Sequence, residues 1–368
     1  MPKTSSILTE VCSLPTAPFV ETAVINYVRE FARLHRGLRF STDEVGNILL
    51  ELPGKKPGPR WIFQAHMDHP GFVSREQAGK RELIAYFRGG VLNDFFPKTR
   101  VVFFTPGGEV RGKVVSVERR KDRDTPSAAL IKLDEPASVP AGAVGMFDQG
   151  EGRAKKGVFY SRAIDDLAGV AAALEMLHRI HPLKLDGTVA VMLTRGEEDG
   201  FVGGLAAVHL KTLLREDDRI VAIECSAMQP YAPQGKGAII RIGDKTSVFN
   251  SAISYFITQQ ADKLAKKDKR FAFQRSLMPG GTCEATVYDA WGYMAGSICV
   301  ALGNYHNMDR KKGKIGPEYI DLNDWECMVK LFIAVAKAGH EFAPGHVELK
   351  AKLGKLYAEK SSLLNKPF

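Results

Sequence analysis

Cysteine is scarce in this chain, which has five cysteines among 368 residues. Their number is odd, and no two of them follow a Cys-x-x-Cys spacing. A disulfide framework or a cysteine zinc site would need paired or closely spaced cysteines. The sequence therefore argues against both kinds of site, and we expect reduced thiols.

Long apolar runs are also missing. A membrane-spanning helix needs about 20 consecutive apolar residues, and a secretory signal needs a basic start before an apolar core. Neither pattern occurs, so we expect a cytoplasmic protein with no membrane partner. A chain of this length that is 45% hydrophobic and 25% charged predicts a globular protein with a sizeable core, divided into two compact units.

The formal net charge of +9 raises the hypothesis of a nucleic-acid partner. Much of the excess lies in short runs such as Arg119-Arg120-Lys121 and Lys266-Lys267, which are typical of solvated surfaces. No motif with interleaved aromatics accompanies them, so we expect no nucleic-acid partner. A non-catalytic basic protein that binds RNA or an acidic partner is the alternative from another class, and it predicts salt-dependent binding that chelators do not affect.

Apolar periodicity predicts alternating strands and helices after residue 158. We expect helices over 166–180, 203–214, 251–267 and 322–338, and strands over 188–193, 220–223, 237–242 and 297–302. Before them, a helix within 16–36, a hairpin over 38–50 and a buried strand from Trp61 are expected. This order predicts an α/β fold, a three-layer α/β/α domain with a mostly parallel sheet.

The segment 70–156 differs in character, with short β-rich runs separated by Gly, Pro and charged clusters. It predicts a small all-β domain of barrel type inserted into the larger domain. We therefore expect a catalytic domain of residues 1–69 and 157–368, and an inserted domain of residues 70–156.

Acidic and histidine side chains follow the apolar runs, where the carboxyl ends of parallel strands collect ligands. They are His66, Asp68, Asp165, Asp166, Glu197, Glu198, Glu224 and His306. Taken alone, a His-x-Asp pair is usually a satisfied polar pair, and Glu-Glu is usually a surface pair. Together, such carboxylates would repel one another unless cations compensate them.

A binuclear metal centre would supply the positive charge that offsets the repulsion between these carboxylates. Asp165 could bridge two ions, with His66 and Glu224 at one and Glu198 and His306 at the other. Mixed imidazole and carboxylate ligands suit Zn²⁺, with Co²⁺ or Mn²⁺ as alternatives. Glu197 would then act as general base and Asp68 would orient His66, which predicts hydrolysis of an amide.

This ordered set resembles the zinc exopeptidase clan, which includes M28 and M20 relatives. The insertion after His66-Met67-Asp68 resembles the M42 branch, the glutamyl or deblocking aminopeptidases. Asp43 to Leu49 is similar to that family's Asp-x-x-Gly-Asn-Leu turn, and Gly280-Gly281-Thr282 is similar to its Gly-Gly-Thr loop.

The resemblance implies a fold of the zinc-exopeptidase type with two divalent metal ions and short peptides as substrates. It implies the metal ligands His66, Asp165, Glu198, Glu224 and His306, with Glu197 and Asp68 as catalytic residues. It also implies substrate binding by the loop of Gly281, Thr282 and Cys283. M42 enzymes commonly form dodecamers, so the resemblance implies a homo-oligomer.

Several positions depart from the family pattern: His69, Leu167, Cys283, Glu284 and, above all, Glu224, where M42 members generally have Asp. Glutamate at that ligand position also occurs in carboxypeptidases and acylamino hydrolases of the clan. A carboxypeptidase or N-acyl amino acid amidohydrolase on the same scaffold is therefore the alternative within enzymes.

Overall fold

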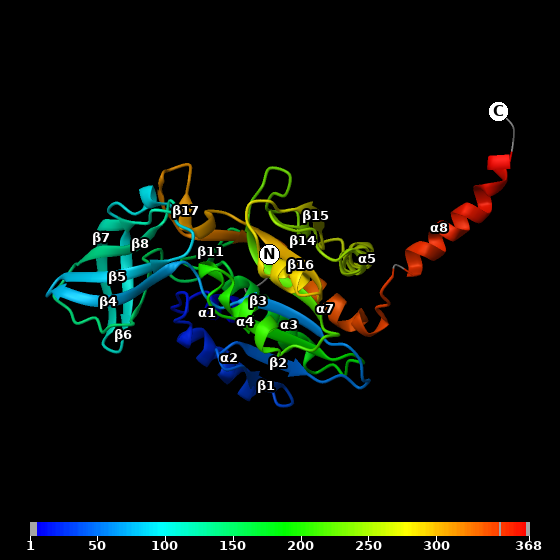
Figure 1. Ribbon diagram of the computed structural model, residues 1–368, viewed down its shortest axis with the longest axis horizontal. Coiled ribbons are helices and arrows are strands. Elements are labelled where there is room, and N and C mark those ends of the chain that lie inside the picture. The colour runs from blue at the N-terminus through cyan, green and yellow to red at the C-terminus, as the bar shows by residue number, and fades with distance from the viewer. Residues whose placement is uncertain (1–5, 346, 366–368) are drawn as a thin grey trace.

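The computed structural model describes residues 6–345 and 347–365. A twisted sheet forms its centre, and over the described residues the strand order is β1-β2-β12-β3-β13-β16-β14-β15 (Figure 1). The strands are β1 (Arg39–Thr42), β2 (Ile48–Leu52), β3 (Trp61–His66), β12 (Val189–Thr194), β13 (Arg219–Ala227), β14 (Ala238–Gly243), β15 (Phe273–Leu277) and β16 (Met294–Leu302). The neighbours β12, β3, β13 and β16 are parallel, and β1 and β2 form the predicted antiparallel hairpin.

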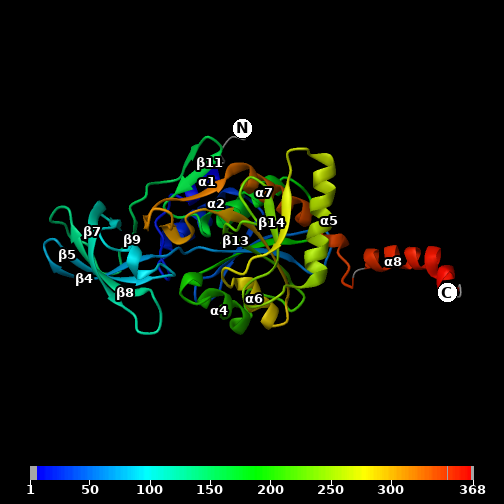
Figure 2. The same ribbon diagram turned by 90° about the horizontal axis from the view of Figure 1, so that it is seen from above.

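Helices cover both faces of this sheet. Phe63 packs into one large core and its neighbour Ile62 into a second core on the opposite face, because successive strand residues point to opposite sides. The helices that contribute to the first core are α1 (Ser6–Val11), α2 (Thr22–Leu34), α3 (Leu167–Ile180), α5 (Ser251–Lys267) and α7 (Leu322–Ala338). The second core receives α4 (Val202–Leu210) and α6 (Glu284–Ala290) (Figure 2). The predicted three-layer α/β/α fold is confirmed.

Local sequence explains where these helices begin. The side chain of Asn250 accepts hydrogen bonds from the N–H groups of Ala252 and Ile253 at the start of α5, both at 3.1 Å. Asp321 caps α7 in the same way. Side-chain oxygens at this position satisfy N–H groups that have no partner within the helix. Helix α3 is buried on almost all sides, which explains why it is Ala-rich and mostly apolar, with its basic residues His178 and Arg179 in the last turn.

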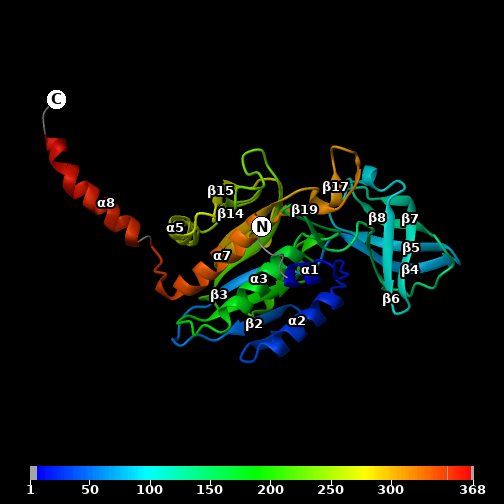
Figure 3. The ribbon, with the colours of Figure 1, turned by 180° about the vertical axis from the view of Figure 1, so that it is seen from behind.

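The segment after β3 forms a closed barrel with strand order β4-β5-β8-β7-β6-β9 (Figure 3). Its strands are β4 (Gly71–Gly79), β5 (Glu82–Arg88), β6 (Arg100–Thr105), β7 (Gly108–Arg119), β8 (Pro126–Leu133) and β9 (Val144–Phe147). Closure of the barrel pairs the edges of the sheet, and Phe72, Phe87 and Phe103 help to fill its interior. The division into separate domains at residues 70 and 156 stays a prediction.

The barrel is tied to the main body through β17 (Met308–Asp309) and β18 (Lys314–Ile315). Met308 and Ile315 are buried in the core of the barrel. A second, small sheet consists of β10 (Arg153–Lys155), β11 (Val158–Ser161) and β19 (Glu318–Asp321). In it, β11 pairs with β10 on one side and with β19 on the other. The segment around His306 therefore contacts the barrel through Met308 and Ile315, and β19, which follows it, pairs with β11.

Helix α8 (Val347–Lys360) extends away from the body at the end opposite the barrel (Figure 1). Leu353, Leu356 and Tyr357 on this helix are exposed. None of the helices in the described part of the chain is long and apolar enough to cross a membrane.

Candidate metal centre

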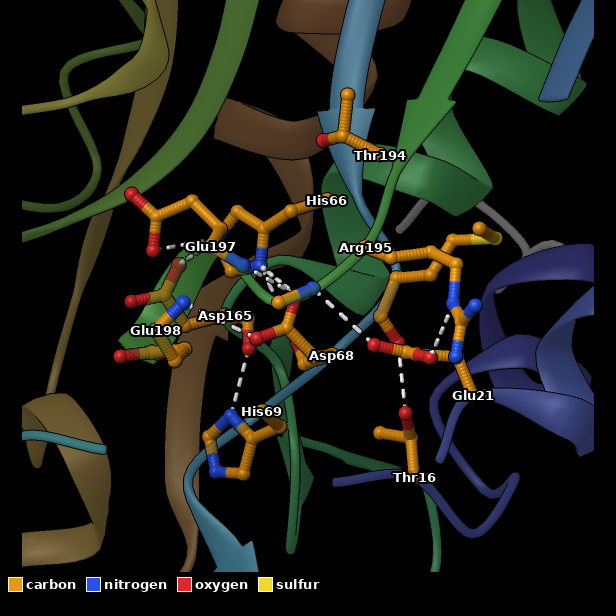
Figure 4. A network of polar contacts seen from close by, with 12 residues as sticks. Thr16, Glu21, His66, Asp68, His69, Asp165, Thr194, Arg195, Glu197 and Glu198 are labelled. Carbon is orange, nitrogen blue, oxygen red and sulfur yellow. Dashed lines mark hydrogen bonds and ion pairs between the residues drawn. The ribbon is translucent and has the colours of Figure 1, made fainter. Parts of the chain in front are cut away.

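Strand ends and the loops that follow them bring the predicted ligands together, and Figure 4 shows His66, Asp165 and Glu198 among them. His66 is the last residue of β3, and Glu197 and Glu198 lie in a 3-10 turn after β12. Asp165 follows β11, and His306 lies in a 3-10 turn after β16. The parallel register pairs His66 with Thr194, so these ends meet at one edge of the sheet.

Glu224 reaches the same place from inside a strand, whereas the sequence predicted that its strand ends at residue 223. Strand β13 continues to Ala227 alongside β16, but it pairs with β3 only up to Ala222. Glu224 lies just beyond the last residue of β13 that pairs with β3, and its carboxylate lies within 4.8 Å of ligand atoms of His66 and Glu197. Ligands commonly bind at the carboxyl ends of parallel strands.

The two carboxylate oxygens of Asp165 face two different histidines. Its Oδ1 lies 3.6 Å from Nε2 of His66, and its Oδ2 lies 3.7 Å from Nε2 of His306. His306 Nε2 is also 3.1 Å from Glu198 Oε1, and His66 Nε2 is 3.9 Å from Glu197 Oε2. Ligand atoms of Asp165, Glu198 and His306 lie within 4.8 Å of one another. The same limit holds for His66, Glu197 and Glu224.

Several of these atoms are buried and make no hydrogen bond. They are Oδ1 of Asp165, together with Oε1 of Glu198 and Nε2 of His306, which lie 3.1 Å apart but do not form a hydrogen bond. A buried polar atom without a partner costs about 1–3 kcal/mol, and more when the group is charged. Divalent cations would satisfy these atoms, so the donor set fits a metal centre.

The pKa values indicate the same need for positive charge. Burial, reinforced by Asp165, raises the pKa of Glu224 to about 8. Burial raises the pKa of Glu197 well above its usual range, and Glu224 and Glu198 add to this effect against the opposing His66. Burial alone would lower the pKa of His306, but Glu198 and Asp165 outweigh it and raise the pKa to about 9. Bound cations would reverse these shifts by favouring the ionised carboxylates and the neutral imidazole.

Each histidine is oriented through its other ring nitrogen. His66 Nδ1 lies 3.2 Å from the carbonyl oxygen of Asp68 and 3.6 Å from its carboxylate. His306 Nδ1 lies 3.2 Å from the carbonyl oxygen of Gly90. When Nδ1 donates to an oxygen, Nε2 is left free to bind a metal ion.

The turn that carries Glu197 and Glu198 is fixed by residues that the sequence did not single out. Glu21 accepts hydrogen bonds from Arg195 Nε at 2.7 Å and from the Gly196 N–H at 3.1 Å (Figure 4). Gly196 has φ 63°, and a Cβ there would lie 2.4 Å from the Phe19 ring, so only glycine fits this turn. The signal in the sequence was weak, because Glu21 is about 175 residues away from its partners.

The backbone of Asp165 is held by a second buried network. His69, which departs from the family pattern, places Nδ1 2.6 Å from the Asp165 carbonyl oxygen and Nε2 3.0 Å from Asn307 Oδ1. Glu318 Oε2 accepts the N–H groups of Ile164 at 2.7 Å and Asp165 at 3.1 Å. The sequence predicted no role for Asn307 or Glu318.

A small pocket opens beside Glu224, with a cavity volume of about 30 Å³. Gly281 and Thr282 line it, together with Tyr305 and Arg241. Cys283 is not among its lining residues. It is 1% exposed and packs against Phe249 and Ala285, at the position that precedes α6.

Comparison with known proteins agrees with this architecture. The Pyrococcus horikoshii TET1 peptidase has a similar structure, with a TM-score of 0.74 and 20% identity over 90% of this chain and 98% of that chain. The aminopeptidase APDkam598 of Desulfurococcus kamchatkensis has a TM-score of 0.74 and 22% identity over 90% of this chain and 93% of that one. A Thermotoga maritima protein described as an endoglucanase also shares the fold, with a TM-score of 0.68, 19% identity and coverage of 90% and 97%. These likenesses establish the fold and not the substrate.

Sequence comparison identifies the family. The Bacillus subtilis (strain 168) protein named "Putative aminopeptidase YhfE" is 24% identical over 223 residues, which cover 55% of this chain and 64% of that protein. The match thus spans less than two thirds of that relative. Residues 46–312 match the family model described as M42 glutamyl aminopeptidase, which is more than half of the chain. The chain therefore belongs to the M42 glutamyl aminopeptidase family.

Proposed function

We propose that the chain is a metal-dependent aminopeptidase that uses two divalent ions to hydrolyse N-terminal residues from short peptides. Its family supports the class of reaction. The observation that carries the metal centre is the geometry of Asp165, whose two oxygens face His66 at 3.6 Å and His306 at 3.7 Å. A carboxylate between two imidazoles is the arrangement that a bridging ligand requires.

Five side chains would hold the two ions. His66, Asp165 and Glu224 would bind one, and Asp165, Glu198 and His306 would bind the other. Zn²⁺ suits this mixture of ligands, and Co²⁺ or Mn²⁺ are accepted by similar sites. When bound, such ions supply the positive charge that polarises a peptide carbonyl and makes a water molecule more acidic.

Glu197 would move the proton during the reaction. Its carboxylate lies at the site, with Oε2 3.9 Å from His66 Nε2. Bound cations would keep this carboxylate ionised, which is the form that a general base requires. Glu197 would take a proton from the attacking water and give it to the leaving amine. Asp68 would keep His66 and the Glu197 backbone in place.

We extend self-assembly to this chain as part of the proposal. The Pyrococcus horikoshii TET1 peptidase is described as assembling into a tetrahedron or a large octahedral shell. A homo-oligomer, with a dodecamer as the reference size, is therefore the expected state in solution. Light scattering coupled to size-exclusion chromatography tests this, and a monomer at micromolar concentration would contradict it.

Metal removal and replacement test the function. After chelation, the protein is supplied with Zn²⁺, Co²⁺ or Mn²⁺ and offered aminoacyl anilides, N-acetyl amino acids and peptides with blocked ends. We expect chelation to abolish hydrolysis and added metal to restore it for substrates with a free amine. Restored cleavage of N-acetyl amino acids alone would favour the amidohydrolase alternative that Glu224 suggests.

The alternative of another class is tested with the same preparations. A non-catalytic basic protein would bind RNA with strong salt dependence, and chelation would leave that binding unchanged. Hydrolysis that persists fully after metal removal would exclude the proposed metal chemistry.

A further inference from the structure

We propose that three histidines at the ends of α2 and α3 form a further metal site, separate from the candidate metal centre. They are His35, which follows α2, His178 in the last turn of α3, and His181, which follows α3. His178 is exposed, and the other two are half-buried. Asp165 of the candidate centre lies before the first residue of α3, so the length of this helix, about 20 Å at 1.5 Å per residue, separates the two sites.

The three imidazole rings meet at His35. Its Nε2 lies 2.9 Å from Nδ1 of His178. Its ring centroid lies 5.2 Å from that of His178 and 5.3 Å from that of His181, edge to face in both cases. His178 and His181 are three residues apart, and the backbone of His181 is still helical, so both lie on the same face of α3. Two helices therefore bring three imidazoles to one place on the surface.

Backbone carbonyls determine which ring nitrogens are free. His35 Nδ1 lies 2.8 Å from the carbonyl oxygen of Phe31, and His181 Nε2 lies 2.7 Å from that of Arg36. A carbonyl oxygen only accepts hydrogen bonds, so both of these nitrogens carry the proton of the neutral ring. The lone pairs are then on Nε2 of His35 and Nδ1 of His181. Histidines that bind metal ions are commonly held by carbonyl oxygens in this way.

The local electrostatics favour a cation. Both helices end at the cluster, and the C-terminal end of a helix carries partial negative charge. The arginines in the last turns, Arg33 and Arg179, pair with neighbouring glutamates. Arg36 is exposed to solvent. The charge of a bound ion would therefore face few opposing charges.

Only a small movement is needed to admit an ion between His35 and His178. Two nitrogens bound to one Zn²⁺ at about 2.0–2.1 Å in tetrahedral geometry lie about 3.3 Å apart. The observed separation of 2.9 Å would have to increase by about 0.4 Å, and the exposed His178 ring has room to move. His178 would then keep its proton on Nε2. Imidazole ligands suit Zn²⁺, Cu²⁺ and Ni²⁺, and three of them leave one position for water.

The experiment compares the wild type with His35→Gln, His178→Gln and His181→Gln. The control is His209→Gln, which removes an exposed histidine of α4. Equilibrium dialysis against micromolar Zn²⁺, followed by elemental analysis, counts the ions bound per chain. Free Zn²⁺ stays in the buffer because an open site with three ligands loses its ion on dialysis against metal-free buffer. Added Cu²⁺ then reports imidazole ligands by electron paramagnetic resonance, and thermal unfolding of the chelated proteins checks that each variant is folded.

We expect the wild type and His209→Gln to bind one ion more than His178→Gln. Loss of a mere orienting contact weakens metal binding about 10–100-fold, so loss of a ligand should lower the affinity for this ion at least about 100-fold. The nitrogen splitting of bound Cu²⁺ should diminish in the same variant. Because the result is a difference between variants, it holds whether or not the candidate metal centre takes up two ions, and a failure of the proposed function would leave this difference in place.

Equal metal contents in the wild type and His178→Gln would overturn the proposal, since the cluster would then be a hydrogen-bonded histidine pair only. An equal loss in His209→Gln would also overturn it, because it would show adventitious binding by surface histidines. Unchanged affinity in His35→Gln or His181→Gln would reject the site of three histidines.

Discussion

The Nδ1 atom of His306 lies 3.2 Å from the carbonyl oxygen of Gly90. Gly90 follows β5 of the barrel, whereas His306 lies after the central strand β16. His306 itself has a left-handed backbone with φ 54°, a conformation that is uncommon for residues with a side chain and is often found at functional sites. The barrel therefore sets the orientation of one proposed metal ligand.

Replacing His306 should empty one metal position before the other. Its Nε2 faces Glu198 and Asp165. It is not part of the proposed metal position that His66 and Glu224 form. We expect His306→Ala to lower the metal content from two ions per chain towards one, as measured by elemental analysis after dialysis. The exposed His209→Ala serves as control. A His306→Ala protein that still holds two ions would contradict the assignment.

Gly90→Ala should weaken the same position without removing a ligand. A Cβ at residue 90 would lie 3.0 Å from Nδ1 of His306, so the imidazole must shift. Loss of such an orienting contact typically weakens metal binding about 10–100-fold. Titration with a competing chelator measures this affinity. Gly107→Ala, in a barrel loop where the nearest atom is 3.7 Å away, should bind metal like the wild type.

The sequence was sufficient to predict most strands of the sheet and the five candidate ligands that the structure brings together, because both follow local patterns. Apolar runs identified strands such as β3, and polar residues directly after them identified His66, Asp165 and Glu198. Strand ends of a parallel sheet meet in space, which accounts for His66 and Glu198. Asp165 instead follows β11 of the small antiparallel sheet, so this rule does not account for its position.

The residues that hold the site were not predicted, because their partners are distant in sequence. Glu21, Gly90 and Glu318 act through hydrogen bonds to segments 150 or more residues away, and periodicity carries no information about such pairs. Arg241 could have been noticed in the sequence, because it is the one charged residue in the apolar strand β14. The periodicity predicted that strand correctly, but it did not predict the pocket beside it.

Glu197→Gln should retain metal and lose turnover. The amide keeps the size of the side chain but is unable to accept a proton from water. General base catalysis typically contributes a factor of 10²–10⁴, so kcat should fall by about that range. Steady-state kinetics and elemental analysis of the same samples measure both properties. Asp199→Asn on the same turn is the matched control, and full activity of Glu197→Gln would exclude this residue as the base.

Asp68→Asn should destabilise the turn that carries the two glutamates. The Asp68 oxygens accept the N–H groups of Glu197 and Glu198, each at 3.0 Å. An asparagine offers one oxygen only, so one N–H would face an NH₂ group. We expect a loss of about 1–3 kcal/mol in the free energy of unfolding, measured by urea denaturation of the chelated protein. The exposed Asp262→Asn should leave the midpoint unchanged, and an equally stable Asp68→Asn would show that these hydrogen bonds are dispensable.

Glu284 should make the stability of the metal-free protein depend on pH. Its carboxylate accepts hydrogen bonds from Thr194 Oγ1 at 2.6 Å and from the Gln64 amide, and burial raises its pKa from 4.5 to about 7. Because the folded pKa is the higher one, the protonated form favours folding. This contribution is fully present below about pH 4.5 and is lost as the pH rises through about 7.

Glu284→Gln removes this titration while keeping an oxygen acceptor. We therefore expect the variant to match the wild type near pH 4.5 and to exceed its free energy of unfolding by about 3 kcal/mol at pH 8. Urea denaturation of chelated protein across this range measures the difference. Bound cations near Glu284 would lower its pKa, so the difference should shrink when metal is added. The exposed Glu82→Gln should follow the wild-type curve, and a Glu284→Gln curve parallel to the wild type from pH 5 to 8 would show that Glu284 does not titrate there.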